Sequence, residues 1–284
     1  LSSKPYSNNV YKRNKIPIIH NQNGVFYKGW YGNGWEKKNA EMSYQFHSAD
    51  YVFYQSNFSK YCSDIFLGKR EGPSEILYNA VDTNFFKPIK KKDLNSDLKI
   101  LVTGKYQEHL YDNLEFSIHI LKKLIDNKFK ANITFAGYYD NQIKKRLINL
   151  SLRYGITDKI NFSGVYSQEN ANYLYNSSDL YFYFVHQSNC PNSVIEAMSC
   201  GLPVICQNTG GLPEIVDEGS GICLKTRESW DKPYLPSVDD AFFAFEKIIN
   251  NYSEYSNNSI NKVKSDHNIN NWIKKHKEIF KKFI

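Results

Sequence analysis

The 284-residue sequence has no apolar run near the roughly 20 residues that a membrane-spanning helix needs, and it does not open with the charged and then apolar stretch of a secretory leader. Its five cysteines form no C-x-x-C pair and show no metal-ligand spacing. We therefore expect reduced thiols in a cytoplasmic protein. Attachment to a membrane surface is left open as an alternative.

Neither the composition nor the charge is extreme. Apolar residues make up 41% and charged residues 23% of the chain, which are ordinary globular values, and the length fits about two domains. The 36 Lys and Arg against 29 Asp and Glu give a net charge of +7, which suits an anionic partner. Because the lysines at 87–92 and 274–282 are not interleaved with a nucleic-acid reading motif, we interpret them as solvated and expect no nucleic-acid partner.

Short apolar runs alternate with longer helical patterns from about residue 50 onward, which is typical of a parallel sheet with crossover helices. A polar, basic, proline-containing stretch at 87–97 marks the expected domain boundary. Before it we expect strands at 16–19, 50–54 and 75–78 and a helix at 59–66. After it the pattern predicts a doubly wound domain, whose ligands lie at the carboxyl ends of the strands: strands 99–103, 132–136, 160–163, 180–185 and 204–206, and helices 113–126, 142–154, 167–176 and 193–199.

The end of the chain predicts an amphipathic helix with one lysine-rich face. We interpret it as a helix docked on the body of the protein, and an interfacial membrane helix is the alternative. Its apolar face consists of Trp272, Ile273, His276, Ile279, Phe280 and Phe283.

The most informative segment, 189–205, reads as a turn followed by a short helix. Ser193 and Glu196 form an S-x-x-E capping box at its start. Gly201 fits the left-handed position after the helix, and Pro203 prevents its continuation. A helix that begins at the end of a buried parallel strand directs free N–H groups into the ligand crevice, where they favour an anion. The alternative is a well-capped helix without a ligand.

Two further glycine-bearing turns follow strands of the same domain. The turn at 208–214 contains Gly210 and Gly211, which either let the backbone approach a ligand or simply make a tight turn. The turn at 103–105 carries Lys105 towards the same crevice. Three such turns on neighbouring strands predict one anionic ligand with sugar or phosphate character.

The chain also contains LYNAVDTNFFKP at 77–88 and NFSG at 161–164. Together with the segments 104–105, 191–203 and 210–216, they resemble the retaining nucleotide-sugar glycosyltransferases of family four. The resemblance implies an α/β protein of the GT-B type, with two Rossmann-like, doubly wound domains of which the N-terminal one is incomplete.

The same resemblance implies a division of the chain into three parts. Residues 1–92 are expected to form a partial N-terminal, acceptor-side domain. Residues 93–262 are expected to form the C-terminal domain that binds the nucleotide-sugar donor. Residues 263–284 are expected to form a C-terminal helix that packs back on the body.

On the donor side, the resemblance implies a role for each matching residue. Glu196 takes the place of the second glutamate of an E-x7-E signature, which accepts hydrogen bonds from ribose hydroxyls, but Ser188 stands at the place of the first. Lys105 stands where the family usually has an arginine against the diphosphate. The implied donor-binding residues are Gly104, Lys105, Gly164, Val165, His186, Ser188, Asn192, Ser193 and Glu196, with Gly164 and Val165 beside the nucleobase.

On the acceptor side, the segment 18–24 resembles a strand end where the family often places a histidine near the transferred sugar. Both His20 and Asn23 are candidates for that place, so we assign His20, Asn23 and Lys105 to the catalytic site. For His20 the alternative is a hydrogen-bonded structural residue. The aromatic, glycine-bearing segment 29–35 is either a platform for a sugar ring or a flexible surface loop.

These observations predict a retaining glycosyltransferase that moves a sugar from a nucleotide diphosphate-sugar to the hydroxyl of a carbohydrate or lipid-linked acceptor, in polysaccharide or glycoconjugate biosynthesis. The resemblance implies no metal and no cofactor. Two alternatives stay open: a catalytically silent nucleotide-sugar-binding or scaffold protein, and a nucleotide-sugar epimerase of the same architecture. No H-E-x-x-H or nucleophile-elbow serine supports a hydrolase.

Overall fold

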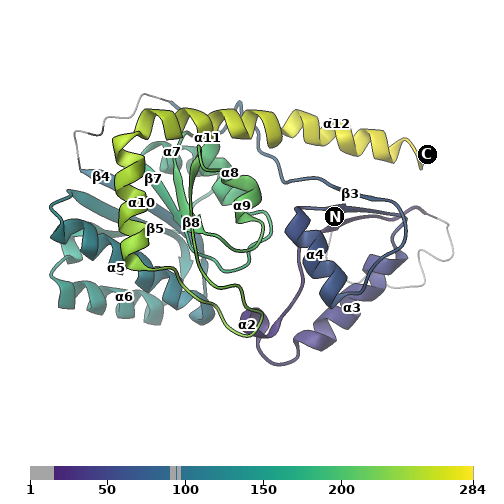
Figure 1. Cartoon of the computed structure of the whole chain (residues 1–284), viewed down its shortest axis with the longest axis horizontal. Coiled ribbons are helices and arrows are strands. Elements are labelled where there is room, and N and C mark those ends of the chain that lie inside the picture. Colours follow the sequence, from purple (N-terminus) through teal and green to yellow (C-terminus); the bar gives the residue numbers. More distant parts are fainter. Residues whose placement is uncertain (1–15, 90–93, 95–96, 284) are drawn as a thin grey trace.

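The computed structural model describes residues 16–89, 94 and 97–283. Lys90 to Lys92, and with them the expected boundary between residues 92 and 93, lie outside the described residues. The described chain forms two parallel sheets, a three-stranded one in the order β1-β2-β3 and a six-stranded one in the order β6-β5-β4-β7-β8-β9. The predicted α/β fold with two Rossmann-like units, the first of them small, is therefore confirmed (Figure 1).

The small sheet brings together β1 (Ile19–Gln22), β2 (Tyr51–Tyr54) and β3 (Ser74–Ile76), and three helices pack with it. The strand expected at 16–19 is wrong except for its last residue. Pro17 has no N–H group for a ladder, and the carbonyl of Ile18 instead accepts hydrogen bonds from the amides of Asp50 and Tyr51 at 2.8 and 3.2 Å. The helices are α2 (Lys28–Tyr31), α3 (Trp35–Ser48) and α4 (Asn57–Phe66).

The large sheet follows the expected order of strands and helices. Ile100 and Leu101 are fully buried and belong to separate hydrophobic clusters, because successive side chains of a strand point to opposite faces and helices cover both. Its strands are β4 (Leu98–Tyr106), β5 (Ala131–Tyr139), β6 (Ile160–Gly164), β7 (Leu180–Tyr183), β8 (Val204–Gln207) and β9 (Gly221–Leu224). Its helices include α5 (Tyr111–Asp126), α6 (Asn141–Tyr154), α7 (Gln168–Asn176), α8 (Asn192–Ser199) and α9 (Leu212–Ile215).

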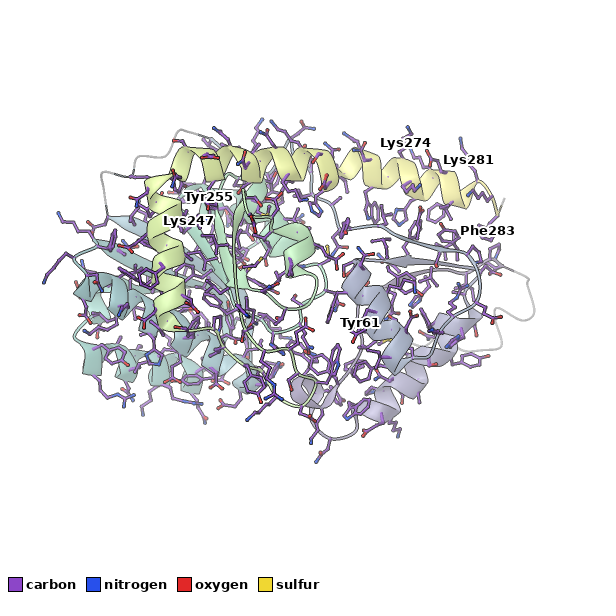
Figure 2. All side chains as sticks on the ribbon, in the orientation of Figure 1. Tyr61, Lys247, Tyr255, Lys274, Lys281 and Phe283 are labelled. Atoms are coloured by element: carbon purple, nitrogen blue, oxygen red, sulfur yellow. The ribbon has the colours of Figure 1, made fainter. Side chains whose placement is uncertain are left out.

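Three helices end the chain: α10 (Val238–Asn250), α11 (Tyr252–Asp266) and α12 (Ile269–Phe280). In Figure 1 the yellow α12 runs back from the large sheet to the small one. The ring of His276 lies on Phe53 of β2 with 4.4 Å between centroids, whereas Lys274 and Lys281 point away from the sheet (Figure 2). Within the described residues, no helix is both long and apolar enough to cross a membrane.

The two units are joined where the chain crosses between them. The amide of Val81 donates to the carbonyl of His267 at 2.9 Å, and the amide of Ile269 donates back to Val81 at 3.1 Å. His267 is buried, and its Nδ1 donates to the carbonyl of Asn79 at 2.9 Å. The two segments that cross between the units, around Val81 and around His267, therefore run side by side and are joined by a short ladder of hydrogen bonds.

Candidate functional site

A cavity of about 410 Å³ lies between the two units, where β1 and β2 of the small sheet and β7 of the large sheet end. None of the described residues that line it is Asp, Glu, Lys or Arg. The lining consists of carboxamide, hydroxyl, aromatic and aliphatic groups, with the sulfur-containing side chains of Met42 and Cys190. Such uncharged polar and aromatic walls suit a neutral polar molecule that hydrogen-bonds and stacks on rings.

The wall from the small sheet is built by the turn after β1. Asn23 lines the cavity, and its Oδ1 accepts a hydrogen bond from Nε2 of Gln55 at 2.9 Å. His20 is not among the lining residues. Its Nε2 donates to Oε1 of Gln22 at 2.7 Å, and Gln22 in turn donates to the carbonyl of Gly24 at 2.5 Å. Of the two acceptor-side candidates, the cavity therefore contains Asn23, while His20 supports the turn from behind.

The aromatic segment at 29–35 lies partly in helices, with a short turn at 32–34 between α2 and α3. Lys28–Tyr31 form α2, and the amide of Gly29 donates to the carbonyl of Trp230 at 2.7 Å. Trp30 lines the cavity, and its ring meets that of His109 edge to face at a centroid distance of 4.8 Å. Gly29 lets this segment pack closely against the residues around 231, where an added Cβ would lie 2.9 Å from the backbone. The position of Trp30 fits the alternative of a platform for a sugar ring.

The wall from the large sheet is the loop between β7 and α8. Ser188 lines the cavity, and its hydroxyl shares a hydrogen bond of 2.9 Å with that of Tyr183. The neighbouring Gln187 is buried with a left-handed φ of 50°. Such strained backbone in a residue other than glycine is often found at functional sites.

Gly210 and Gly211 pack against this loop. The amide of Gly211 donates to the carbonyl of Ser188 at 2.8 Å. A Cβ on Gly211 would lie only 1.9 Å from the carbonyl oxygen of Asn189. The glycine pair therefore lets two loops touch, and the interpretation that it brings backbone close to a ligand is not supported.

The segment between β9 and α10 reaches α2 (Figure 1). Its Trp230 packs against Tyr27 and Phe66 at centroid distances of 5.1 and 4.8 Å. Its Ser229 carbonyl accepts a 3.1 Å hydrogen bond from Nε2 of His186, which lines the cavity. Burial lowers the pKa of His186, so this side chain is favoured in its neutral form.

Helix α8 starts directly after Pro191, a lining residue of the cavity. The predicted capping box is wrong, because the helix begins at Asn192 and Pro191 occupies the cap position without a side-chain hydrogen bond. Ser193 thus lies inside the first turn. Glu196 is half-buried, and its Oε2 accepts a 2.9 Å hydrogen bond from the hydroxyl of Tyr175. Burial raises the pKa of Glu196, and the bond from Tyr175 opposes that rise.

The remaining donor-side candidates lie along the same edge of the large sheet. The turn expected at 103–105 is wrong, because these residues continue β4 to Tyr106 and pair with β5. Gly104 and Lys105 therefore lie within the last residues of β4, which neighbours β7, and Lys105 is exposed. Gly164 ends β6, two strands further along, and Val165 after it is 75% exposed. The fold therefore brings Asn23, His186 and Ser188 into the cavity and places Asn192, Ser193 and Glu196 beside it. Along the sheet edge lie Gly104, Lys105, Gly164 and Val165, and His20 stays behind the turn after β1.

Sequence reasoning assigned no role to two residues that the structure places at this site, Glu214 and Trp230. Glu214 forms hydrogen bonds between the two units, and it lies within the segment 210–216, which is one of the segments that carry the family resemblance. Trp230 stands in a segment without helix or strand, and nothing in its local pattern indicates its partners. In the described part of the chain, no group of three or more His, Cys, Asp or Glu is placed to hold a metal ion.

Comparison with known proteins identifies one family. The family model described as "Glycosyl transferases group 1" matches residues 84–232, which include the whole segment from β4 to β9. The match therefore covers the large sheet and the wall of the cavity that this sheet supplies.

Curated relatives and solved structures extend the likeness. The chain is 27% identical to a probable sucrose-phosphate synthase of Thermosipho melanesiensis over 66% of this chain and 42% of that protein. It is 26% identical to the alpha-1,3/1,6-mannosyltransferase ALG2 of Dictyostelium discoideum over 71% and 53% of the two chains. The chain thus spans about half the length of these curated relatives. The fold is similar to that of Anabaena HepE in complex with UDP and glucose, with a TM-score of 0.77, 14% identity, and coverage of 95% of this chain and 73% of HepE.

Proposed function

The chain belongs to the glycosyl transferases group 1 family, and from that membership we propose that it transfers a sugar from a nucleotide diphosphate-sugar to an acceptor hydroxyl with retention at the anomeric carbon. The observation that carries the proposal is the uncharged cavity between the two sheets, with one wall from each unit. A transferase needs both walls, because aligning two substrates in one cleft removes much of the entropic barrier to their reaction.

On the donor side, the proposal assigns the diphosphate to Lys105 and to the first turn of α8. A lysine ammonium and the N–H groups at a helix start both stabilise a leaving group with growing negative charge. Asn192 and Ser193 belong to that first turn. The proposal assigns the ribose hydroxyls to Glu196, whose Oε1 is not used by the bond from Tyr175.

The nucleobase is assigned to the carboxyl ends of β4 and β6 and to the residue after β6. In the proposal Gly104, Gly164 and Val165 lie beside the base, and the exposed side chain of Val165 offers an apolar contact there. His186 and Ser188 face the transferred sugar. Since Ser188 stands where the family has a glutamate, this sugar is held by neutral groups.

The acceptor is assigned to the wall from the small sheet, with Asn23 as the residue nearest the transferred sugar. His20 acts through Gln22, whose amide holds the carbonyl of Gly24. The proposed acceptor is a carbohydrate or a lipid-linked sugar, and the proposed pathway makes a polysaccharide or glycoconjugate in the cytoplasm. Peripheral membrane contact is part of this proposal only for a lipid-linked acceptor.

We also propose that the chain divides into an acceptor-side domain to residue 92, a donor domain over 93–262 and a closing segment over 263–284. The support is that the strands of the small sheet all precede this first boundary and those of the large sheet all follow it. The closing segment contains α12, which packs on Phe53 of the small sheet.

A binding screen followed by a transfer assay tests the function. UDP, GDP and ADP, and their sugars, are added in turn, and the midpoint of thermal unfolding is measured. A ligand at 100 times its dissociation constant stabilises the fold by about 2.7 kcal/mol. Sugars that bind are then offered to a panel of glycan and lipid-linked acceptors, and the anomeric configuration of the product is determined by NMR. Binding without transfer would favour a silent binding protein, and a changed sugar stereochemistry without acceptor would favour an epimerase.

The variant Glu196→Gln tests whether a nucleotide found in this screen binds at the proposed site. Because a glutamine oxygen can still accept the hydrogen bond from Tyr175, the melting temperature is expected to stay close to that of the wild type, while nucleotide binding weakens. The matched control is Glu169→Gln, an exposed residue in the first turn of α7. Equal binding by both variants would remove Glu196 from the site.

A further inference from the structure

We propose that Glu214 is a positioning residue that fixes the separation of the two cavity walls by tying the donor-side unit to the first turn of α4. For its effect on catalysis, this inference rests on the proposed function. The geometric part, the tie between the units, stands on the contacts of Glu214 alone.

The carboxylate of Glu214 receives four hydrogen bonds from the small unit. Its Oε2 accepts from the backbone amide of Asn57 at 2.8 Å, from Nδ2 of the same residue at 2.8 Å, and from the hydroxyl of Tyr78 at 2.9 Å. Its Oε1 accepts from the amide of Phe58 at 2.8 Å. One side chain of α9 therefore holds two segments that lie 136 to 157 positions away in the sequence.

The first turn of α4 is a strong site for a carboxylate. The first N–H groups of a helix have no partner within it and carry partial positive charge. Here the hydroxyl of Ser56 accepts from the amide of Ser59, and Glu214 satisfies the two amides between them. Burial and the neighbouring carboxylate raise the pKa of Tyr78 to about 12, so its hydroxyl keeps its proton and donates at neutral pH.

Both ends of this tie lead directly to a cavity wall. On the donor side, α9 begins after Gly211, whose amide donates to the carbonyl of Ser188 at 2.8 Å. On the acceptor side, the hydroxyl of Ser59 in α4 donates to the carbonyl of Gln22 at 2.9 Å, one residue before Asn23. Moving Glu214 away from α4 would therefore change the distance between Ser188 and Asn23.

Other polar contacts also join the units, namely the ladder of Val81 with His267 and Ile269 and the 2.7 Å bond from the amide of Gly29 to the carbonyl of Trp230. These bonds link uncharged backbone groups. Lys28 and Asp231 approach to 3.6 Å with both side chains largely exposed, and exposed ion pairs contribute little. Trp230 packs on apolar rings, and such contacts are not directional. The bonds to Glu214 are charge-assisted and set a fixed geometry.

Spin labels test the tie without any substrate. Exposed cysteines are introduced through Tyr61→Cys on α4 and Lys247→Cys on α10 (Figure 2), and the distance between the labels is measured by pulsed electron resonance. With Glu214→Ala, the distance distribution is expected to broaden and move to longer values. Tyr78→Phe, which removes one of the four bonds, is expected to give a smaller change. Glu218→Gln, an exposed residue four positions further on, is the control.

Hydrogen exchange and kinetics complete the test, with Glu214→Gln as a conservative variant in case Glu214→Ala does not fold. The amides of Asn57 and Phe58 are expected to exchange faster in both variants. For a donor that the wild type uses, kcat is expected to fall about 10- to 100-fold, with unchanged affinity for the nucleoside diphosphate, because the residues assigned to it all lie on the large unit.

The outcomes separate this inference from the proposed function. Unchanged label distances and unchanged exchange in the Glu214 variants would overturn the tie, whatever the activity. Altered distances with a wild-type kcat would overturn the positioning role. A wild type that transfers no sugar from any donor, yet shows the altered distances in its Glu214 variants, would overturn the proposed function and leave the tie supported.

Discussion

The hydroxyl of Tyr175 donates a 2.9 Å hydrogen bond to Oε2 of Glu196 and so joins the last turn of α7 to the middle of α8. Tyr175 is fully buried, and burial raises its pKa well above the ordinary value. Its hydroxyl therefore remains a donor throughout the neutral range. The bond favours the ionised form of the Glu196 carboxylate and so opposes the rise in its pKa that burial causes.

Removing this donor with Tyr175→Phe is expected to lower the free energy of unfolding by about 1–3 kcal/mol, because a half-buried carboxylate loses its partner. The pKa of Glu196 is expected to rise further. If nucleotide binding needs the ionised carboxylate, the variant then loses affinity at a higher pH than the wild type as the solution is acidified. Calorimetric titrations with the best-binding nucleotide from pH 7 downward measure this shift. Tyr173→Phe, with a side chain 73% exposed on the same helix, is the control, and identical pH profiles for the two variants would contradict the account.

Much of the large sheet follows from local pattern. Its strands are rich in apolar and β-branched residues, such as Ile100 to Val102 in β4 and Ile133 to Ala136 in β5, and such short runs between helical patterns are easily recognised. The polar strand IHNQ at 19–22 has no such signal. Its place is set by pairing with Tyr51 to Tyr54, more than 30 positions later, which no local pattern contains.

The candidate site, like the fold, can be predicted from local sequence patterns only in part. That loops gather at one sheet edge is predictable because parallel strands end there, and Ser188, His186 and Asn23 do meet in one cavity. The turn expected at 103–105 is not found, because β4 continues to Tyr106 by pairing with β5. The S-x-x-E pattern predicts a cap, yet the donor to Glu196 comes from Tyr175 on another helix. A carboxylate such as Glu214 in the same way acquires its partners only through the packing of two units.

A substitution of Lys105 tests the diphosphate site without a large change in the stability of the fold. Its side chain is exposed at the end of β4, so Lys105→Ala is expected to change stability by less than about 0.5 kcal/mol. If the ammonium faces the diphosphate, affinity for nucleoside diphosphates falls while affinity for the bare nucleoside is kept. Isothermal titration of both ligands measures the difference. Lys99→Ala, an exposed lysine near the other end of the same strand, is the control, and an equal loss in both variants would exclude a specific role.

The close approach of Gly211 to the 187–190 loop predicts a different kind of effect. With Gly211→Ala, the added methyl group would meet the carbonyl oxygen of Asn189 at 1.9 Å, so one of the two loops must move. We expect a loss of about 1–3 kcal/mol in the free energy of unfolding and weaker sugar binding in the cavity, measured by denaturant titration and by affinity for the donor. The control Gly219→Ala meets only the end of the Asn258 side chain, at 3.0 Å. A stable Gly211→Ala variant with wild-type affinity would contradict the packing described.

Five histidines give the fold a pH dependence with a definite sign. Burial is the main cause that lowers the pKa of five rings below the ordinary value of 6.5: His20, His109, His186, His267 and His276. As the pH falls through 6.5, the unfolded chain takes up protons that the folded chain does not. The stability that these neutral rings contribute is therefore present above pH 6.5 and is lost as the pH falls through their lower folded-state values, with a slope of at most about 1.4 kcal/mol per pH unit for each ring. Urea unfolding at pH 7.5, 6.5 and 5.5 measures it. In the variant His267→Gln, the free energy of unfolding should fall less steeply with falling pH, because a buried ring has been removed. If the free energy of unfolding of the wild type does not fall between pH 7.5 and 5.5, these rings accept protons freely in the folded protein and the account is wrong.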